Sequence, residues 1–224
     1  MFVNEALRQS AAHVFVDNVF SPSLTTDDQH HLSRVLRLRD GESVTCSDGK
    51  GSWVQCEWRN DSIAVIGESV TEAPRNTPLT VVIAPVKGDK TDLVIEKLVE
   101  IGIDHIVILA PLDYSVVRWA HDKIPQVMAR YQRIAKAAAM QSRRVFLPTV
   151  SGPTPLGDVL GQSVGFAEPG GAAHPRDVTT LVIGPEGGFS PAELALASVT
   201  VSLGEGILRA ETAAIVGAAL MVAH

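Results

Sequence analysis

Residues 181–191, LVIGPEGGFSP, contain an apolar run, a glycine-rich turn and the start of a helix. The run at 180–184 is typical of a buried strand, and SPAE at 190–193 has the pattern of a helix capping box. In open α/β sheets, ligands bind at the carboxyl ends of strands, where glycines let backbone amides come close to them. The segment therefore predicts a strand, a ligand-binding turn and a helix within an α/β fold.

The composition of the turn at 184–188 narrows the choice of ligand. Its spacing matches neither the dinucleotide-binding fingerprint nor the P-loop, so it does not support a phosphate site. Glu186 would repel a phosphate group, whereas a carboxylate suits a ligand with positive charge or ribose hydroxyls. An ordinary strand–helix turn is the alternative interpretation.

A second segment, SLGEGILRAETA at 202–213, has the same order of strand end, glycine turn and helix start. Two such loops at neighbouring strand ends would form two walls of one pocket. Glu211 and Thr212 also have a structural alternative, because an acidic residue and a threonine both stabilise a helix N-terminus.

The segments around these loops alternate apolar strands with helices from residue 79 onward. The expected strands span 79–85, 105–111, 180–184 and 199–203. The expected helices span 89–103, 124–142, 190–197 and 211–223. Strands that are apolar throughout and alternate with helices indicate a parallel sheet with helices on both faces. Residues 152–161 and 169–177 are expected to be loops.

Residues 1–72 have a different pattern, typical of short β-strands. The expected strands span 12–17, 43–47, 52–58 and 62–70, with a hairpin turn at 48–51, DGKG. Only 26–36 is expected to be helical, with Thr25 or Thr26 as its N-cap. Several short strands with one helix predict a small β-barrel. Residues 71–78 contain two prolines and are the expected linker, so the predicted domains are 1–72 and 73–224.

The composition of the 224-residue chain excludes several classes of protein. Hydrophobic residues make up 46% and charged residues 20%, which excludes bulk disorder. No apolar run approaches the roughly 20 residues of a membrane helix, and the first residues lack the pattern of a secretory signal. Two cysteines and scattered histidines give no metal-ligand spacing. We therefore expect a cytoplasmic protein with no membrane segment and no metal.

The charge of the chain is unevenly distributed. A net charge of −6 argues against nonspecific binding of nucleic acid, yet residues 118–149 hold seven basic residues and one acidic residue. The basic side chains form two groups, Arg34, Arg37 and Arg39 in the first region and Arg130, Arg133, Lys136, Arg143 and Arg144 in the second. Such patches suit an anionic partner that docks locally, and solvated helix faces are the alternative.

Five segments resemble those of the RsmE family, which comprises SPOUT-class methyltransferases that modify a uridine N3 in 16S ribosomal RNA. The glycine-rich segments GPEGGFSPAE (184–193) and LGEGILRAETA (203–213) resemble the two cofactor loops of that family. Further similar segments, in the same order, are HHLSRVLRLRDGE (30–42), KGDKTDLVIEKLVEIGI (87–103) and QSRRVFLP (141–148). The matches cover nearly the whole chain.

The resemblance implies a fold, a cofactor and partners. The first domain would be a PUA-like β-barrel that binds RNA, and the second a SPOUT-type α/β domain with a trefoil knot. The cofactor would be S-adenosylmethionine and the substrate 16S ribosomal RNA in the small ribosomal subunit. The active unit would be a homodimer, for which the helix at 211–223, rich in small residues, offers a surface for close packing.

The resemblance also implies roles for individual residues. Arg209 would stabilise negative charge on the uracil, with Arg143 or Arg144 as the second candidate, and Glu211 is a possible base. The residues expected to bind the cofactor are Leu109, Gly184, Pro185, Glu186, Gly187, Gly188, Leu203, Gly204, Ile207, Leu208 and Thr212. The residues expected to bind RNA are Arg34, Arg37, Arg130, Arg133, Arg143 and Arg144.

Two positions depart from the family pattern. Gly206 stands where the family usually has arginine, and Met140 stands where it often has glutamate. Two alternatives therefore stay open: a SPOUT methyltransferase that acts on another RNA atom, such as a ribose 2′-hydroxyl, or a noncatalytic assembly factor that binds ribosomal RNA.

Overall fold

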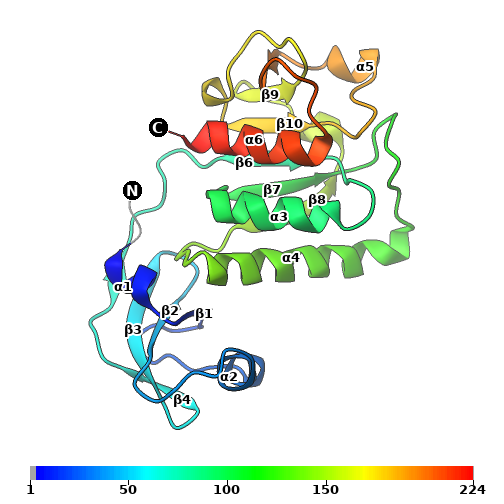
Figure 1. Cartoon of the computed structure of the whole chain (residues 1–224). Coiled ribbons are helices and arrows are strands. Elements are labelled where there is room, and N and C mark those ends of the chain that lie inside the picture. Colours follow the sequence, from blue (N-terminus) through cyan, green and yellow to red (C-terminus); the bar gives the residue numbers. More distant parts are fainter. Residues whose placement is uncertain (1–3, 224) are drawn as a thin grey trace. The chain divides into compact units, whose positions relative to one another are not determined.

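A computed structural model describes residues 4–223 and divides the chain into two compact units (Figure 1). The first unit contains the described residues up to Arg75 together with Ala139–Leu147. The second contains Asn76–Ala138 and the described residues from Pro148 onward. The chain thus returns to the first unit at the end of helix α4 (Ile124–Gln141), a feature that the sequence pattern did not indicate.

The first unit is built on a sheet in the order β1-β2-β3-β4, with β5 paired to β3. Its strands are β1 (Ala12–Phe15), β2 (Ser43–Ser47), β3 (Ser52–Arg59), β4 (Ser62–Val65) and β5 (Val70–Thr71). The expected hairpin of β2 and β3 is confirmed, and the Asp48 carboxylate closes its turn by accepting the amide of Lys50 at 2.7 Å. The strand expected at 62–70 is divided into β4 and β5.

Helices complete the first unit. Helix α1 (Glu5–Gln9) was not expected, whereas α2 (Thr26–His30) continues into the π-helix η1 (His31–Val35) and matches the expected helix at 26–36. Thr25 is the N-cap, because its hydroxyl accepts the amide of Asp28 at 3.1 Å. Leu32 packs in a core with Val44, Cys56 and Trp58, residues that the alternation of strand side chains directs to one face.

The returning segment is fastened to β1 and β2 by hydrogen bonds. The Val145 carbonyl accepts the Ser47 hydroxyl at 2.9 Å, and the Arg144 carbonyl lies 3.0 Å from Nε2 of His13. Burial lowers the pKa of His13 to about 4, so its ring is neutral at pH 7. Residues 139–147 are therefore an integral part of the first unit.

The second unit contains a six-stranded sheet that is parallel throughout, as expected, in the order β11-β9-β10-β6-β7-β8. Its strands are β6 (Thr80–Ile83), β7 (His105–Leu109), β8 (Thr149–Thr154), β9 (Val164–Ala167), β10 (Thr180–Ile183) and β11 (Val199–Val201). The expectation of a loop throughout 152–161 is wrong, because β8 and the 3-10 helix η3 (Leu156–Val159) occupy much of it. Glycine and proline inside β8 hid its strand pattern.

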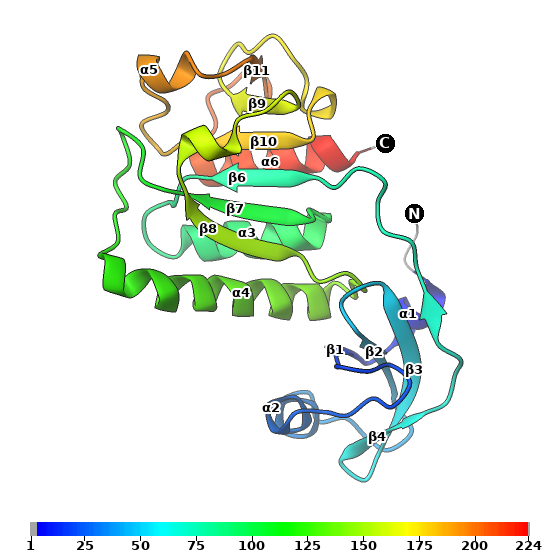
Figure 2. The same ribbon diagram turned by 180° about the vertical axis from the view of Figure 1, so that it is seen from behind.

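The long helices cover one face of this sheet. Helices α3 (Lys90–Ile101) and α6 (Ala210–Val222) lie side by side on that face (Figures 1 and 2). Gly217 of α6 packs so closely on β10 that an added Cβ would lie 2.4 Å from the Leu181 side chain. The expected parallel sheet covered by helices is confirmed, although different elements cover its two faces.

The opposite face carries a second core. Val82, Phe166 and Val182 pack there beneath Leu156 of η3, because alternate strand residues point away from α3 and α6. Helix α5 (Pro191–Leu194) follows β10 and is shorter than the expected 190–197. A further 3-10 helix, η4 (Pro175–Asp177), lies in the region expected to be a loop, and the trefoil knot stays a prediction.

Two features are absent from the described part of the chain. No helix within residues 4–223 is long and apolar enough to cross a membrane. Over the same residues, no group of three or more His, Cys, Asp or Glu side chains is placed to hold a metal ion.

Candidate active site

The carboxyl ends of three neighbouring strands, β11, β9 and β10, open into a cleft of about 630 Å³. Its walls come from the loops after these strands and from the first residue of α3. This position, outside the strand ends of a parallel sheet, is where open α/β folds bind ligands. The lining residues are Lys90, Leu203, Gly204, Ala213 and residues 167–169, 183–189 and 206–211.

The first glycine-rich loop, residues 184–190, is closely packed against the protein. An added Cβ would lie 3.2 Å from the Phe189 ring at Gly184 and 2.8 Å from the Tyr114 Cβ at Gly187. The expected capping box is confirmed, since the Ser190 hydroxyl accepts the amide of Glu193 at 3.3 Å and the Ser190 amide donates to the Glu193 carboxylate at 2.8 Å. The loop is therefore fixed at Gly184, at Gly187 and at its exit into α5.

The second glycine-rich loop, residues 203–209, is more exposed. Gly204 has a φ of +132°, a conformation that favours glycine, and Ile207 is 88% exposed. Arg209 is the N-cap residue of α6 but makes no side-chain capping hydrogen bond. Its exposed guanidinium has no polar partner among residues 4–223, so it is available to a ligand.

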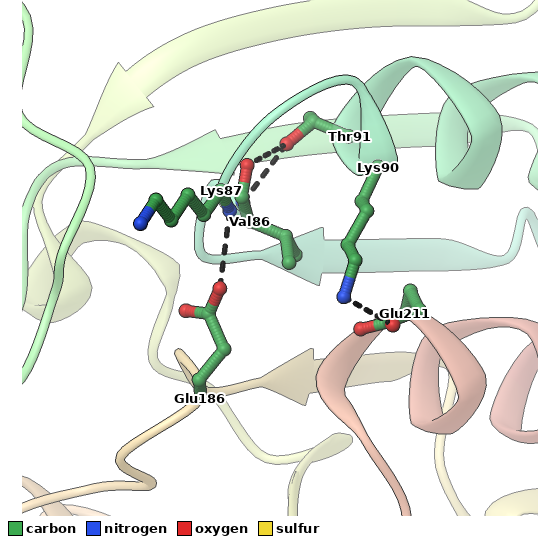
Figure 3. Close-up of polar contacts among 6 residues, drawn as sticks. All are labelled: Val86, Lys87, Lys90, Thr91, Glu186 and Glu211. Atoms are coloured by element: carbon green, nitrogen blue, oxygen red, sulfur yellow. Dashed lines mark hydrogen bonds and ion pairs between the residues drawn. The ribbon is translucent and has the colours of Figure 1, made fainter.

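The connection from β6 to α3, with the first residue of α3, contacts the first loop and the start of α6 (Figure 3). The Lys87 amide donates to Oε1 of Glu186 at 3.1 Å, and Nζ of Lys90 lies 2.7 Å from Oε1 of Glu211. The hydroxyl of Thr91 accepts the amide of Val86 at 2.9 Å and thereby closes the turn before α3. This short stretch thus links the first loop to the helix that follows the second loop.

The ion pair with Lys90 determines the charge of Glu211. Hydrogen bonding to Lys90 holds the pKa of Glu211 below its ordinary value, so this carboxylate is ionised at neutral pH. Its second oxygen, Oε2, is buried and has no hydrogen-bond partner among the described residues. A carboxylate with a lowered pKa is a weak proton acceptor, which favours Glu211 as the partner of Lys90 over Glu211 as a general base.

Most of the residues expected to bind the cofactor line this cleft. Those that do are Gly184, Pro185, Glu186, Gly187, Gly188, Leu203, Gly204, Ile207 and Leu208, and both residues expected to be catalytic, Arg209 and Glu211, lie there as well. Leu109 and Thr212 do not line it. Leu109 is fully buried in the core beneath η3, and Thr212 is exposed on α6.

The cleft also contains residues that the sequence analysis missed. Lys90, Glu168, Pro169 and Phe189 are among its lining residues. Glu168 and Pro169 belong to AEPGG at 167–171, which is a third glycine turn directly after a strand. Recognition of β9 would have revealed this turn, but the strand has only four residues and one of them is glycine.

The arginines expected to bind RNA have different surroundings. Arg34, Arg37 and Arg133 are exposed, whereas Arg130 forms an ion pair with Asp92. The Arg143 guanidinium donates to the carbonyls of Met140 at 2.9 Å and Ser10 at 3.0 Å, and desolvation lowers its pKa. Arg143 is therefore engaged in holding the first unit together.

Arg144 and the two departures from the family pattern are placed as follows. Arg144 is partly exposed, and its backbone carbonyl contacts His13. Met140 packs against the core of the first unit. Gly206 lines the cleft, and an added Cβ would meet nothing within 4 Å, so the site has room for a larger side chain there.

Family models match both parts of the chain. A model described as an RNA methyltransferase domain matches residues 73–222, and one described as an RNA methyltransferase PUA domain matches residues 24–57. The ribosomal RNA small subunit methyltransferase E of Mycobacterium bovis is 32% identical over an alignment of 217 residues, which covers 85% of this chain and 81% of that protein. The enzyme of the same name from Bacillus subtilis is 29% identical over 219 residues, 85% of each chain.

Solved structures share the fold. A Legionella pneumophila protein in complex with the bound cofactor SAM superimposes with a TM-score of 0.78 at 25% identity, over 93% of this chain and 96% of that one. The ribosomal RNA small subunit methyltransferase E of Neisseria gonorrhoeae, bound to S-adenosyl methionine, gives a TM-score of 0.79 at 24% identity, over 94% and 96% of the two chains. At 24% identity, the similarity to the Neisseria gonorrhoeae enzyme shows a shared fold alone.

Proposed function

This chain belongs to the RNA methyltransferase family, and we propose that it transfers the methyl group of S-adenosylmethionine to N3 of a uridine in the 16S RNA of the small ribosomal subunit. The observation that carries this proposal is the cleft itself. Both segments that resemble the cofactor loops, 184–193 and 203–213, line it at the carboxyl ends of β10 and β11, the two strands on either side of β9. The names of the relatives from Mycobacterium bovis and Bacillus subtilis describe them as methyltransferases of ribosomal RNA.

The cleft has a size and lining that fit S-adenosylmethionine. Its volume of about 630 Å³ lies within the range of small-molecule sites. Glycine-rich backbone can approach an adenine and a ribose, and Leu203, Ile207 and Leu208 offer apolar surface. Glu168 and Glu186 suit hydroxyl groups and positive charge. When bound, the cofactor supplies an electrophilic methyl group on a sulfonium.

The chemistry of the reaction assigns a task to Arg209. Uridine N3 carries a proton and is mostly neutral at pH 7, so this proton must be lost to solvent as N3 takes up the methyl group, and its loss places negative charge on the uracil oxygens. The exposed guanidinium of Arg209, which makes no hydrogen bond or ion pair within residues 4–223, is suited to stabilise that charge. Because N3 lies on the pairing edge, the base must leave its helix or stack before it reaches Arg209.

RNA binding is proposed for both units. The PUA domain match covers the region of Arg34 and Arg37, whose side chains are exposed. In the second unit, Arg133 is exposed and Arg130 is partly neutralised by Asp92. These arginines, with Arg144, are the proposed contacts to phosphate groups. Arg143 is a weaker candidate, because its guanidinium already binds carbonyl groups.

The homodimer belongs to the same proposal. Helix α6 has small residues, but Ala214, Gly217 and Ala218 are buried within the protomer, so only its remaining surface is available to a partner. The homodimer is therefore supported by the family resemblance more than by this helix. Light scattering of the purified protein measures the oligomeric state, and a ribosomal substrate would place the enzyme in the cytoplasm.

A methyl-transfer assay tests the proposed function. Purified protein is incubated with labelled S-adenosylmethionine and unmethylated small ribosomal subunits, and the labelled nucleoside is identified. We expect label in 3-methyluridine. Label in a 2′-O-methylated nucleoside would overturn the target atom, and cofactor binding without any transfer would favour the noncatalytic RNA-binding alternative.

A further inference from the structure

The cleft is lined by more negative than positive side chains. Its carboxylates are Glu168, Glu186 and Glu211, and its cations are Lys90 and Arg209. S-adenosylmethionine, the cofactor of the proposed function, carries a sulfonium, an ammonium and one carboxylate. The first two suit a cleft rich in carboxylates, whereas the third needs one of the two cations.

The two cations are held differently. Arg209 is exposed at the N-cap of α6 and has no polar partner among the residues described. Nζ of Lys90, in contrast, lies 2.7 Å from Oε1 of Glu211, and the Lys90 side chain is 40% exposed while that of Glu211 is 14% exposed. An exposed cation suits a base that arrives from outside, and a cation held in the wall by an ion pair suits a ligand that binds within the cleft.

The ion pair joins the first turns of two helices. Lys90 is the first residue of α3 and Glu211 is the second residue of α6, and their side chains point toward each other across the cleft wall (Figure 3). Helix N-termini carry partial positive charge, which favours an anion at this place. An ammonium has three donors and Glu211 occupies one, so donors remain for a second carboxylate.

We propose that Lys90 binds the carboxylate of the methionyl part of S-adenosylmethionine and that Glu211 is the positioning residue for Lys90. This inference rests on the cofactor named in the proposed function but is independent of the methylated atom. Glu211 orients the ammonium through Oε1. The lysine then supplies charge-assisted hydrogen bonds, which are stronger than bonds between neutral groups.

Isothermal titration calorimetry with two ligands tests this inference. The ligands are S-adenosylmethionine and 5′-methylthioadenosine, which has the adenine, ribose and sulfur but lacks the carboxylate and ammonium. We expect Lys90→Met to raise the Kd of S-adenosylmethionine by about 10- to 100-fold, which is the effect of losing a hydrogen bond between charged groups. The Kd of 5′-methylthioadenosine should not change, which also shows that the variant is folded.

Lys97→Met is the matched control. Lys97 also lies on α3 and pairs with Glu96 at 2.7 Å and Glu100 at 2.9 Å, but it does not line the cleft. Its replacement should leave both Kd values unchanged. Equal weakening of both ligands by Lys90→Met would overturn the proposal, because it would mean that Lys90 only braces the loops. An unchanged Kd of S-adenosylmethionine would overturn it as well.

A double-mutant cycle tests the positioning role of Glu211. Glu211→Gln should weaken S-adenosylmethionine several-fold in the wild-type background and have no further effect when Lys90 is already methionine. Lys90→Arg should restore part of the affinity that Lys90→Met loses. Additive effects of the two substitutions would contradict the proposed coupling. If the wild type binds S-adenosylmethionine but forms no 3-methyluridine, only the proposed reaction fails.

Discussion

The two glycine-rich loops of the cleft resemble each other in sequence pattern but differ in how the protein holds them. The loop at 184–190 is fixed by contacts of Gly184 with Phe189 and of Gly187 with Tyr114, and by the hydrogen bond from the Lys87 amide to Glu186. The loop at 203–209 has an exposed Ile207 and ends at Arg209, whose side chain makes no hydrogen bond or ion pair with any residue that the structure describes.

This difference suggests that the two loops have different roles in binding. A loop whose backbone is already fixed loses little conformational entropy when a ligand binds, so the first loop is suited to hold the cofactor. The second loop offers apolar side chains to the cofactor and ends at Arg209, whose guanidinium makes no hydrogen bond or ion pair with the described residues, so this end of the loop is suited to contact the reacting base. The following substitutions compare the two loops, in order of decreasing expected effect.

Arg209→Ala, in the second loop, is expected to have the largest effect on methyl transfer. The loss of a group that stabilises developing charge lowers kcat by about 100-fold or more. The Kd of S-adenosylmethionine should change little, because Arg209 is assigned to the uracil. Single-turnover methylation and calorimetry measure the two quantities.

Arg176→Ala, at an exposed arginine of η4 outside the cleft, is the control for that experiment. It should methylate at the wild-type rate. Normal turnover by Arg209→Ala would remove Arg209 from the mechanism. A large loss of affinity for S-adenosylmethionine would instead assign Arg209 to binding of the cofactor.

Gly187→Ala and Gly206→Ala place a methyl group in each of the two loops. In the first loop the new Cβ would lie 2.8 Å from that of Tyr114, so the packing must shift, and the free energy of unfolding should fall by about 1–3 kcal/mol. In the second loop the Cβ meets nothing within 4 Å, and the change should stay within about 0.5 kcal/mol.

Urea denaturation and the Kd of S-adenosylmethionine measure both glycine variants. Gly187→Ala should also raise that Kd, because Gly187 lines the cleft and must move. Equal tolerance of the two substitutions would contradict the difference in packing between the loops.

Ser190→Ala and Ser202→Ala compare hydrogen bonds at the two loops. Ser190 caps α5, and loss of an N-cap lowers the free energy of unfolding by about 1 kcal/mol. Ser190 is buried, whereas the Ser202 hydroxyl makes solvent-exposed contacts of similar length with the amide and carbonyl of Gly204, at 3.4 Å and 3.3 Å. Its loss should cost less than about 0.5 kcal/mol, and a larger loss for Ser202→Ala than for Ser190→Ala in urea denaturation would reverse the comparison.

The smallest expected effect is a pH dependence at the start of α6. Because the pKa of Glu211 is lower in the folded protein than its ordinary value of 4.5, its contribution to stability is complete above that value and is lost as the pH falls through the lowered pKa. The stability of the wild type should therefore decline more steeply in acid than that of Glu211→Gln. If the thermal stability of the wild type and of Glu211→Gln fell equally with decreasing pH, Lys90 would not stabilise the ionised form of Glu211.

Local patterns in the sequence were sufficient to predict the elements that form the walls of the cleft. The strand at 180–184, its glycine turn and the capping box depend on residues that are close in the chain, and all three are present in the structure. The hairpin at 43–58 was equally local. Such features follow from backbone preferences of glycine, proline and capping residues.

Features that depend on distant residues were not predictable. The ion pair of Lys90 with Glu211 joins residues 121 positions apart, and only the order of the strands brings them together. The engagement of Arg143 by carbonyls near the N-terminus likewise depends on the return of residues 139–147 to the first unit. A basic residue in a sequence does not show whether its charge is free.

Amide hydrogen exchange with and without S-adenosylmethionine tests most directly whether both loops bind one cofactor molecule. Saturating cofactor should slow exchange in 184–190 and in 203–209 and leave the hairpin of β2 and β3 unchanged. The change should be larger in the second loop, which has fewer protein contacts in the free protein. Protection confined to segments that do not line the cleft, or in neither of the two loops, would contradict the assignment of the cleft as the cofactor site.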